Sequence, residues 1–190
     1  MRRLTRSMIV VAAIVFIGVP TQARADGYVS PWAGINFANG NADQRGTFGV
    51  NAGSMGKGVI GGEVSFGFSP SFWGPSSQFG TNSVLDLMGN VIVGIPIGGQ
   101  HGKGLRPYAT GGLGLIRNQA DGGRVFQPKV SDNDFGWNAG AGVMGFFNDH
   151  VGLRGDVRYY RTINGNINDS FDFSSGDLYY WRGSFGLVIR

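Results

Sequence analysis

The stretch that decides the fold runs from residue 135 to residue 147 and reads Phe-Gly-Trp-Asn-Ala-Gly-Ala-Gly-Val-Met-Gly-Phe-Phe. One set of alternating positions is almost entirely apolar, and it holds Phe135, Trp137, Ala139, Ala141, Val143 and Phe147. The other set is smaller and more polar on average, with Gly136, Asn138, Gly140, Gly142, Met144 and Phe146. This period of two predicts a strand with two chemically different faces. At about 3.3 Å per residue the strand would extend roughly 40 Å, a length that favours a tilted crossing of a lipid bilayer.

The N-terminus predicts export from the cytoplasm. Three arginines within the first six residues precede a continuous apolar run, Met8–Val19. Ala23 and Ala25 then supply small residues at the spacing that a signal peptidase recognises. The run is shorter than the roughly 20 residues of a spanning helix, which disfavours a membrane anchor. We therefore expect a cleavable signal peptide over residues 1–25 and one domain over residues 26–190.

Loss of residues 1–25 would change the charge balance of the chain. This segment contains four of the 16 basic residues and no acid, which leaves twelve bases against 12 acids. The formal net charge is then zero, so no nucleic-acid partner is expected. The chain contains no cysteine, which excludes disulfides and thiolate metal sites.

Eight segments share the alternation, and the connections between them alternate in length. The segments are Tyr28–Phe37, Thr47–Met55, Val59–Phe68, Val84–Ile97, Leu105–Arg117, Phe135–Phe147, Val151–Ile163 and Leu178–Ile189. The odd-numbered connections are long and rich in Gly, Asn, Asp and Ser, whereas the even-numbered ones are short. Long loops at one end and tight turns at the other are typical of a transmembrane barrel with periplasmic turns. We therefore predict an all-β fold, an eight-stranded antiparallel up-and-down transmembrane β-barrel.

The two faces of these segments predict a lipid-facing surface and a polar lumen. Aromatic residues are expected to form girdles at both membrane interfaces, with Tyr28 and Phe147 on the inner side and Phe37, Phe48, Phe68, Trp137, Tyr159 and Trp181 on the outer side. Seven charged side chains fall on the opposite face: Glu63, Asp86, Arg106, Arg154, Asp156, Arg158 and Arg182. The interior of an eight-stranded barrel is only wide enough for side chains. We hypothesise that these charges pair across the lumen in an ionic network that fills and braces the barrel.

Three motifs carry a family resemblance. They are Arg106-Pro-Tyr-Ala-Thr-Gly-Gly-Leu-Gly-Leu, Trp137-Asn-Ala-Gly-Ala-Gly-Val-Met-Gly and Val151-Gly-Leu-Arg-Gly-Asp-Val-Arg-Tyr-Tyr-Arg. In this order the chain resembles the small outer-membrane β-barrel family typified by the OmpA transmembrane domain. The resemblance implies the outer membrane of a Gram-negative-type bacterium, contact with outer-membrane lipids, and insertion by the barrel-assembly machinery. Family members commonly end on an aromatic residue, whereas this chain ends on Arg190.

Neither of two features that could carry chemistry predicts a catalytic or cofactor site. Residues Gly56–Gly61 match the dinucleotide pattern G-x-G-x-x-G, but a strand follows where that fold requires a helix, so we expect a hairpin turn. His101 and His150 fall in the periplasmic turns, where they cannot reach a substrate in the outer leaflet. No enzyme activity, metal or cofactor is therefore expected.

Phe72 and Trp73 in the second long loop are candidate recognition residues. The alternative is that these rings fold back onto the barrel rim or the headgroups. The predicted function is structural, a non-enzymatic role in membrane integrity with surface loops available for a partner that the sequence does not identify. A narrow porin-like channel, a surface adhesin and a soluble periplasmic ligand-binding barrel are the alternatives.

Overall fold

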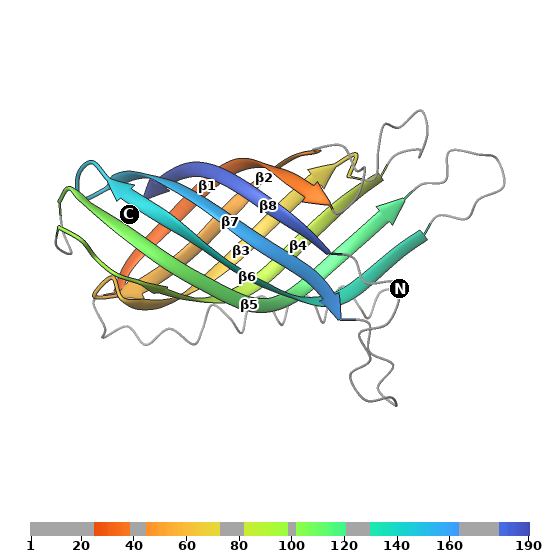
Figure 1. The fold of residues 1–190 in the computed structure, drawn as a ribbon, viewed down its shortest axis with the longest axis horizontal. Coiled ribbons are helices and arrows are strands. Elements are labelled where there is room, and N and C mark those ends of the chain that lie inside the picture. The colour runs from red at the N-terminus through yellow and green to blue at the C-terminus, as the bar shows by residue number, and fades with distance from the viewer. Residues whose placement is uncertain (1–24, 39–44, 73–81, 99–101, 121–129, 164–178) are drawn as a thin grey trace.

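The computed structural model describes residues 25–38, 45–72, 82–98, 102–120, 130–163 and 179–190. Over these ranges the chain forms eight antiparallel strands that close into a barrel, with β8 paired to β1 (Figure 1). The strands are β1 Ala25–Ala38, β2 Arg45–Gly56, β3 Ile60–Pro70, β4 Asn82–Gly94, β5 Gly104–Ala120, β6 Val130–Phe146, β7 Val151–Ile163 and β8 Tyr179–Ile189. The predicted fold class is confirmed. In the part of the chain that the structure describes, no helix is long and apolar enough to cross a membrane.

The observed strands differ from the predicted ones mainly at their ends. β6 begins at Val130, five residues earlier than predicted, because it pairs with the extended end of β5. β4 ends at Gly94 instead of Ile97. Pro96 follows and has no N–H to donate, which ends the regular ladder and leaves a single bridge between Ile97 and Leu105.

The register of the strand pairs fixes the shape of the barrel. Following paired residues once around all eight strands leads from Ala25 to Ile35, ten residues further along β1. Ten residues at about 3.3 Å, spread over eight strands at about 4.8 Å, correspond to a strand tilt of about 40°. Such a barrel has an interior that side chains can fill completely.

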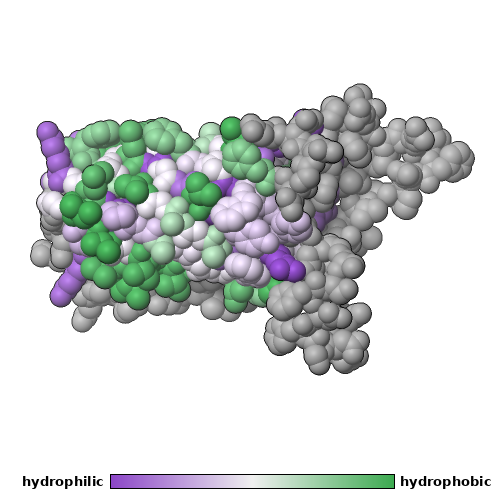
Figure 2. All heavy atoms as spheres, in the orientation of Figure 1, coloured by the Kyte–Doolittle hydropathy of each residue, from purple (hydrophilic) through white to green (hydrophobic). Residues whose placement is uncertain are grey.

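Burial follows the predicted period of two. In β7, every even-numbered residue from Gly152 to Thr162 is buried, while Val151, Val157 and Ile163 on the other face are exposed. Figure 2 shows strongly hydrophobic side chains gathered on the barrel wall, most densely toward the end that carries the short turns. The exposed face is therefore the apolar surface that a bilayer requires.

The aromatic girdle at the opposite end of the barrel is built from contacting rings. The ring of Tyr159 lies 5.5 Å from that of Trp137 and 5.2 Å from that of Trp181. Phe48 and Phe68 pack edge to face at 5.6 Å. These residues lie near the strand ends from which the long connections depart, as predicted.

The prediction for Tyr28 was wrong. We expected this ring in the inner girdle, but it is only 5% exposed and points into the lumen, where its hydroxyl donates to Glu63. The alternation that places Ile35 and Phe37 outside places Trp32 and Asn36 inside, and Tyr28 has the same even-numbered parity, so it cannot face lipid.

Candidate functional site

The candidate functional site is the polar lumen, whose centre holds a network of four charged side chains. Arg154 pairs with Glu63, and its Nε atom lies 2.9 Å from Asp156 Oδ2. Arg158 Nη2 lies 2.8 Å from Glu63 Oε1, and Arg158 Nε lies 3.3 Å from Asp156 Oδ1. Each carboxylate therefore faces two arginines. We call these four residues the central network; with two arginines and two carboxylates its formal charge is zero.

The central network joins opposite sides of the barrel. Glu63 is on β3, and the other three members of the network are on β7, the strand directly across the closed ring. Two tyrosines extend the network to further strands: Tyr28 of β1 donates to Glu63 at 2.7 Å, and Tyr108 of β5 donates to Asp156 at 2.7 Å. Ser184 of β8 also donates to Asp156, at 2.9 Å. Five strands are thus connected through two carboxylates.

A second ionic group lies closer to the long-connection end. Arg182 of β8 makes a two-pronged contact with Asp86 of β4, at 3.1 Å from Nη1 and 2.6 Å from Nη2. Its Nε donates to Asn36, and its Nη1 and Nη2 donate to the hydroxyls of Tyr160 and Tyr180. β4 and β8 also face each other across the ring. We call Arg182, Asp86 and these three neutral partners the outer cluster.

Aromatic rings enclose the guanidinium of the outer cluster. Arg182 Cζ lies 4.6 Å from the centre of the Tyr160 ring and 5.0 Å from the centre of the Trp32 ring. Tyr160 and Tyr180 stack in parallel at 4.9 Å. Such cation–π contacts strengthen when water is excluded, as it is around this fully buried arginine.

Arg106 lies at a different level of the lumen from the two clusters. It is buried near the short-turn end, where its Nη1 lies 3.9 Å from Met55 Sδ and its guanidinium lies 5.4 Å from the centre of the Phe146 ring. Six of the seven predicted lumen charges are therefore brought together in two clusters, and the seventh, Arg106, lies beside Met55 and Phe146.

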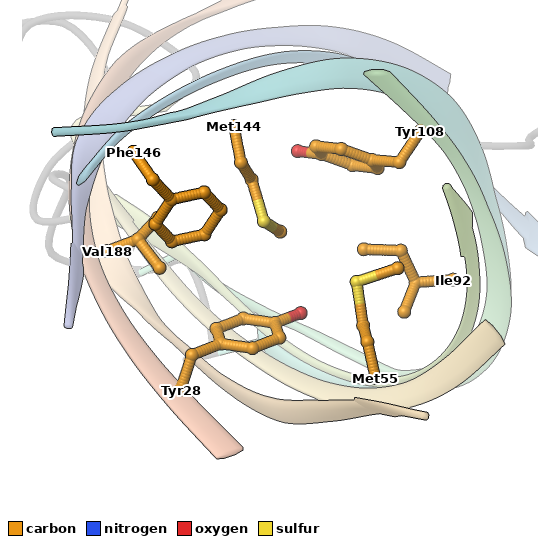
Figure 3. Packing of buried hydrophobic residues seen from close by; sticks show 7 residues of the cluster. All are labelled: Tyr28, Met55, Ile92, Tyr108, Met144, Phe146 and Val188. Atoms are coloured by element: carbon orange, nitrogen blue, oxygen red, sulfur yellow. The ribbon is translucent and has the colours of Figure 1, made fainter. Parts of the chain in front are cut away.

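Buried apolar and aromatic side chains line the lumen on either side of the central network. At the short-turn end, seven buried residues project inward from the ring of strands: Tyr28, Met55, Ile92, Tyr108, Met144, Phe146 and Val188 (Figure 3). Toward the other end, a second cluster holds Phe72, Val84, Met88, Ile116, Tyr160 and Tyr180. The charged centre is therefore sandwiched between two apolar layers.

Inward-facing glycines make room for the large lumen side chains. A Cβ atom on Gly140 would lie 2.7 Å from Arg158 Cγ, and one on Gly67 would lie 2.6 Å from Arg182 Nη1. Both separations are shorter than van der Waals contact. The close approach of a neighbouring arginine therefore favours glycine at these two positions, out of 35 glycines in the chain.

The other candidate residues from the sequence are placed as follows. Phe72 is 5% exposed and packs edge to face on Tyr180 at 5.2 Å, which is the arrangement in which the ring folds back onto the barrel. Trp73, His101 and Ala23 lie outside the described residues. His150 is exposed on the turn between β6 and β7. No group of three or more metal-binding side chains occurs in the described part of the chain.

Sequence reasoning missed two sets of residues. The hydroxyl partners Tyr28, Tyr108 and Tyr180 share the alternation of the lumen charges, so counting parity along each strand would have found them. Arg117 and Arg161 share the parity of the lipid-facing residues instead. The same count of alternating positions along each strand therefore predicts that both arginines lie on the outer wall.

A closed barrel with an apolar wall and an interior filled by side chains, most of whose charges are paired, defines an integral membrane protein of the outer-membrane type. The chain belongs to the outer membrane protein beta-barrel domain family, whose model matches residues 9–179. A search of curated proteins gave no match. The protein is located in the bacterial outer membrane.

Solved structures share this fold at low sequence identity. Neisserial surface protein A is 15% identical, with a TM-score of 0.62 over 87% of this chain and 97% of that one. Outer membrane protein H of P. aeruginosa is 20% identical, with a TM-score of 0.53 over 87% and 99%. The attachment invasion locus protein Ail of Yersinia pestis, solved with the heparin analogue sucrose octasulfate, is 12% identical, with a TM-score of 0.52 over 87% and 99%.

Proposed function

We propose that the protein is a non-enzymatic structural component of the outer membrane, which seals and stabilises the bilayer as a rigid barrel. In this proposal the mature protein comprises residues 26–190, after removal of a signal peptide over residues 1–25. The observation that carries the proposal is the packed lumen, in which ion pairs connect β3 to β7 and β4 to β8. A side-chain network that crosses the interior braces opposite walls against collapse.

The chemistry of the lumen supports bracing over catalysis. The carboxylates Glu63, Asp86 and Asp156 are buried, and each is engaged by at least one arginine and one hydroxyl or second arginine. Carboxylates held in this way are already neutralised by their partners and shielded from any substrate, whereas a general base must be within reach of the proton it removes. Their arrangement favours a structural role.

A porin-like channel is disfavoured by the same packing. Solutes would have to pass two clusters of buried apolar side chains and two ionic clusters. We expect the purified barrel in a planar lipid bilayer to give conductance near the background, and a strain that lacks it to become more sensitive to detergent. Stable single-channel steps from the wild-type barrel would contradict the structural proposal and favour the channel.

A second candidate function is contact with a surface partner through the outer end of the barrel. The observation in its favour is that the four odd-numbered connections, which are the longer ones in the sequence, all depart from that end. A structural neighbour, Ail, was solved with a heparin analogue. Shortening the connections 121–129 and 164–178 while keeping the barrel folded tests this candidate, since a surface adhesin would lose cell attachment. Insertion by the barrel-assembly machinery remains a prediction.

A further inference from the structure

One of the eight strand pairs contains a break, and it is the pair that closes the barrel. The register of each of the other seven pairs runs without interruption through the described strands. Between β1 and β8 the register stops at the pair Trp32–Gly186 and resumes only at the pair Val29–Ile189. We call the interface of β1 and β8 the seam, and the two unpaired positions on each strand its break.

A proline in the middle of β1 causes the break. The carbonyl oxygen of Pro31 faces β8, since a Cβ atom on Gly186 would lie 2.3 Å from it. The nitrogen and the carbonyl of a strand residue face the same neighbouring strand, so the nitrogen of Pro31 also faces β8. This nitrogen has no hydrogen to donate, and the carbonyl of Leu187, which continues the register opposite Pro31, therefore lacks its ladder donor. Proline in sheets is ordinarily confined to edge strands or strand ends, whereas a closed barrel has no edge strand.

Pro107 of β5 shows the same residue at the end of a ladder. Its carbonyl accepts a hydrogen bond from the backbone nitrogen of Ile95 at 2.9 Å, one residue beyond the end of β4 at Gly94. The donor that Pro107 lacks therefore belongs to a ladder that has already ended, and the pairing of Pro107 with β6 is continuous. Pro31 lacks its donor inside a ladder instead. In the hydrocarbon core no water can replace that donor, so the bare carbonyl weakens the seam.

On the lumen side, the residues at the break are small or turned away from the seam. Ser30 is buried, and its hydroxyl has no hydrogen-bond partner among the described residues. Gly186 has no side chain, and the ring of Trp32 lies toward β2, where a Cβ atom on Gly49 would be 2.6 Å from it. A carbonyl without its donor and a hydroxyl without a partner therefore lie one residue apart in the register. Unsatisfied polar groups of this kind are rare in buried positions and mark a weak point of the wall.

The outer half of the seam is better connected than the short-turn half. Over Trp32–Ala38 the register with β8 is continuous. The Nε atom of Arg182 also donates to Asn36 Oδ1 at 3.0 Å, which joins the two strands through the outer cluster. On the short-turn side of the break, the one paired position within the described strands is Val29 with Ile189. A ladder and a side-chain contact thus hold the outer half, and a single residue pair holds the other.

We propose that the barrel opens at this break. The short-turn half of β8 separates from β1 while the outer half of the seam stays closed, and Trp32 and Gly186 are the hinge positions. The otherwise continuous wall thereby has one section through which the interior can communicate with the surrounding lipid. Local opening occurs where stabilising contacts are fewest, which is the condition of this half of the seam. The inference goes beyond the proposed sealing role, because it concerns the local motion of one strand pair.

The test measures hydrogen–deuterium exchange of single backbone amides by NMR. The full barrel is folded in detergent micelles, and heat-modifiable migration confirms the fold of each variant. The amide of Leu187 reports on the short-turn half of the seam and that of Phe185 on the outer half, since both face β1. Pro31→Ala supplies the missing donor. Pro107→Ala is the matched control, because it supplies a missing donor at the end of another ladder.

We expect the Leu187 amide of the wild type to exchange at least about tenfold faster than the Phe185 amide. Pro31→Ala should slow exchange at Leu187 by about five- to tenfold, the effect of one added ladder hydrogen bond. Pro107→Ala should leave both rates unchanged. Equal wild-type rates at the two amides would overturn the proposal. A rate at Leu187 that Pro31→Ala leaves unchanged would also overturn it, because the cause would then be ordinary fraying at the end of β8.

A reversible cross-link gives a second measurement. The chain contains no cysteine, so Ser30→Cys combined with Val188→Cys introduces a single disulfide across the break. We expect exchange at Leu187 to slow to the rate of Phe185 in the oxidised form and to become fast again after reduction. Fast exchange that persists with the disulfide formed would contradict opening at the break. Neither measurement depends on conductance or detergent sensitivity, so this inference and the proposed function fail separately.

Discussion

The two ionic groups in the lumen differ in how completely their arginines are bonded. In the outer cluster, all three nitrogens of Arg182 donate, and they reach Asp86, Asn36 and two tyrosines. In the central network, Arg158 donates through Nε and Nη2, while its buried Nη1 has no hydrogen-bond partner among the described residues. In the outer cluster, every guanidinium nitrogen of the single arginine is hydrogen-bonded. In the central network, two arginines share two carboxylates, and one guanidinium nitrogen has no partner among the described residues.

This difference determines how each group should respond to the loss of an arginine. Glu63 and Asp156 each contact both Arg154 and Arg158, so each carboxylate keeps one arginine partner when one of the two arginines is removed. Among the described residues, Asp86 forms its ion pair with Arg182 alone. The shared carboxylates therefore make the central network tolerant of the loss of one arginine, whereas the outer cluster depends on Arg182.

The largest effect is expected from Arg182→Met. The substitution leaves the carboxylate of Asp86 buried without its cation, and breaking a buried pair in this way typically costs about 3–5 kcal/mol. The measurement is the free energy of unfolding by urea in lipid vesicles, with heat-modifiable migration as a second readout.

The paired control for that experiment removes both charges. Arg182→Met combined with Asp86→Leu replaces the ion pair by apolar side chains of similar size, and such replacements are often neutral or stabilising. We expect most of the lost stability to return in the double variant. A single variant as stable as the wild type would show that the outer cluster does not brace the barrel.

Arg158→Met should destabilise the barrel less, by about 2 kcal/mol, because Arg154 continues to contact Glu63 and Asp156. The Nη1 atom that the substitution also removes has no hydrogen-bond partner to lose in the described residues. Unfolding measured beside Arg182→Met gives the comparison directly. If Arg158→Met and Arg182→Met lost equal stability, the shared carboxylates would not protect the central network against the loss of an arginine. If neither Arg158 nor Asp156 substitution changed the unfolding at all, the bracing hypothesis itself would fail.

The fold was predictable from the sequence because alternation and connection length are local properties. The period of two in β7 separates Val157 from Arg158 without knowledge of any partner strand. Strand number followed from the same pattern. Tyr28 was misplaced because an aromatic near a strand end matched the girdle expectation, although its parity pointed inward.

The pairing of the lumen charges was not predictable, because it depends on the register around the whole ring. Whether Glu63 meets Arg154 or Arg182 is decided by the ten-residue offset accumulated over eight strand pairs. Arg106 illustrates the consequence: it shares the inward parity of the other six charges, yet its height in the barrel places it beside Met55 and Phe146. Parity gives the face of a residue, and only register gives its neighbours.

The smallest of these effects tests how tightly the outer cluster is packed. A Cβ atom on Gly67 would lie 2.6 Å from Arg182 Nη1 and 2.8 Å from Asp86 Oδ1, so Gly67→Ala must displace the ion pair. We expect a loss of about 1–2 kcal/mol, typical of overpacking. Gly89→Ala on the neighbouring strand β4 is the matched control, since its Cβ would point outward and approach nothing closer than 3.8 Å. That control should change stability by less than about 0.5 kcal/mol. Equal losses of stability in both variants would mean that the cost comes from the strand backbone and that the outer cluster has room to move. A loss confined to Gly67→Ala would show that the cost arises at the Arg182–Asp86 contact.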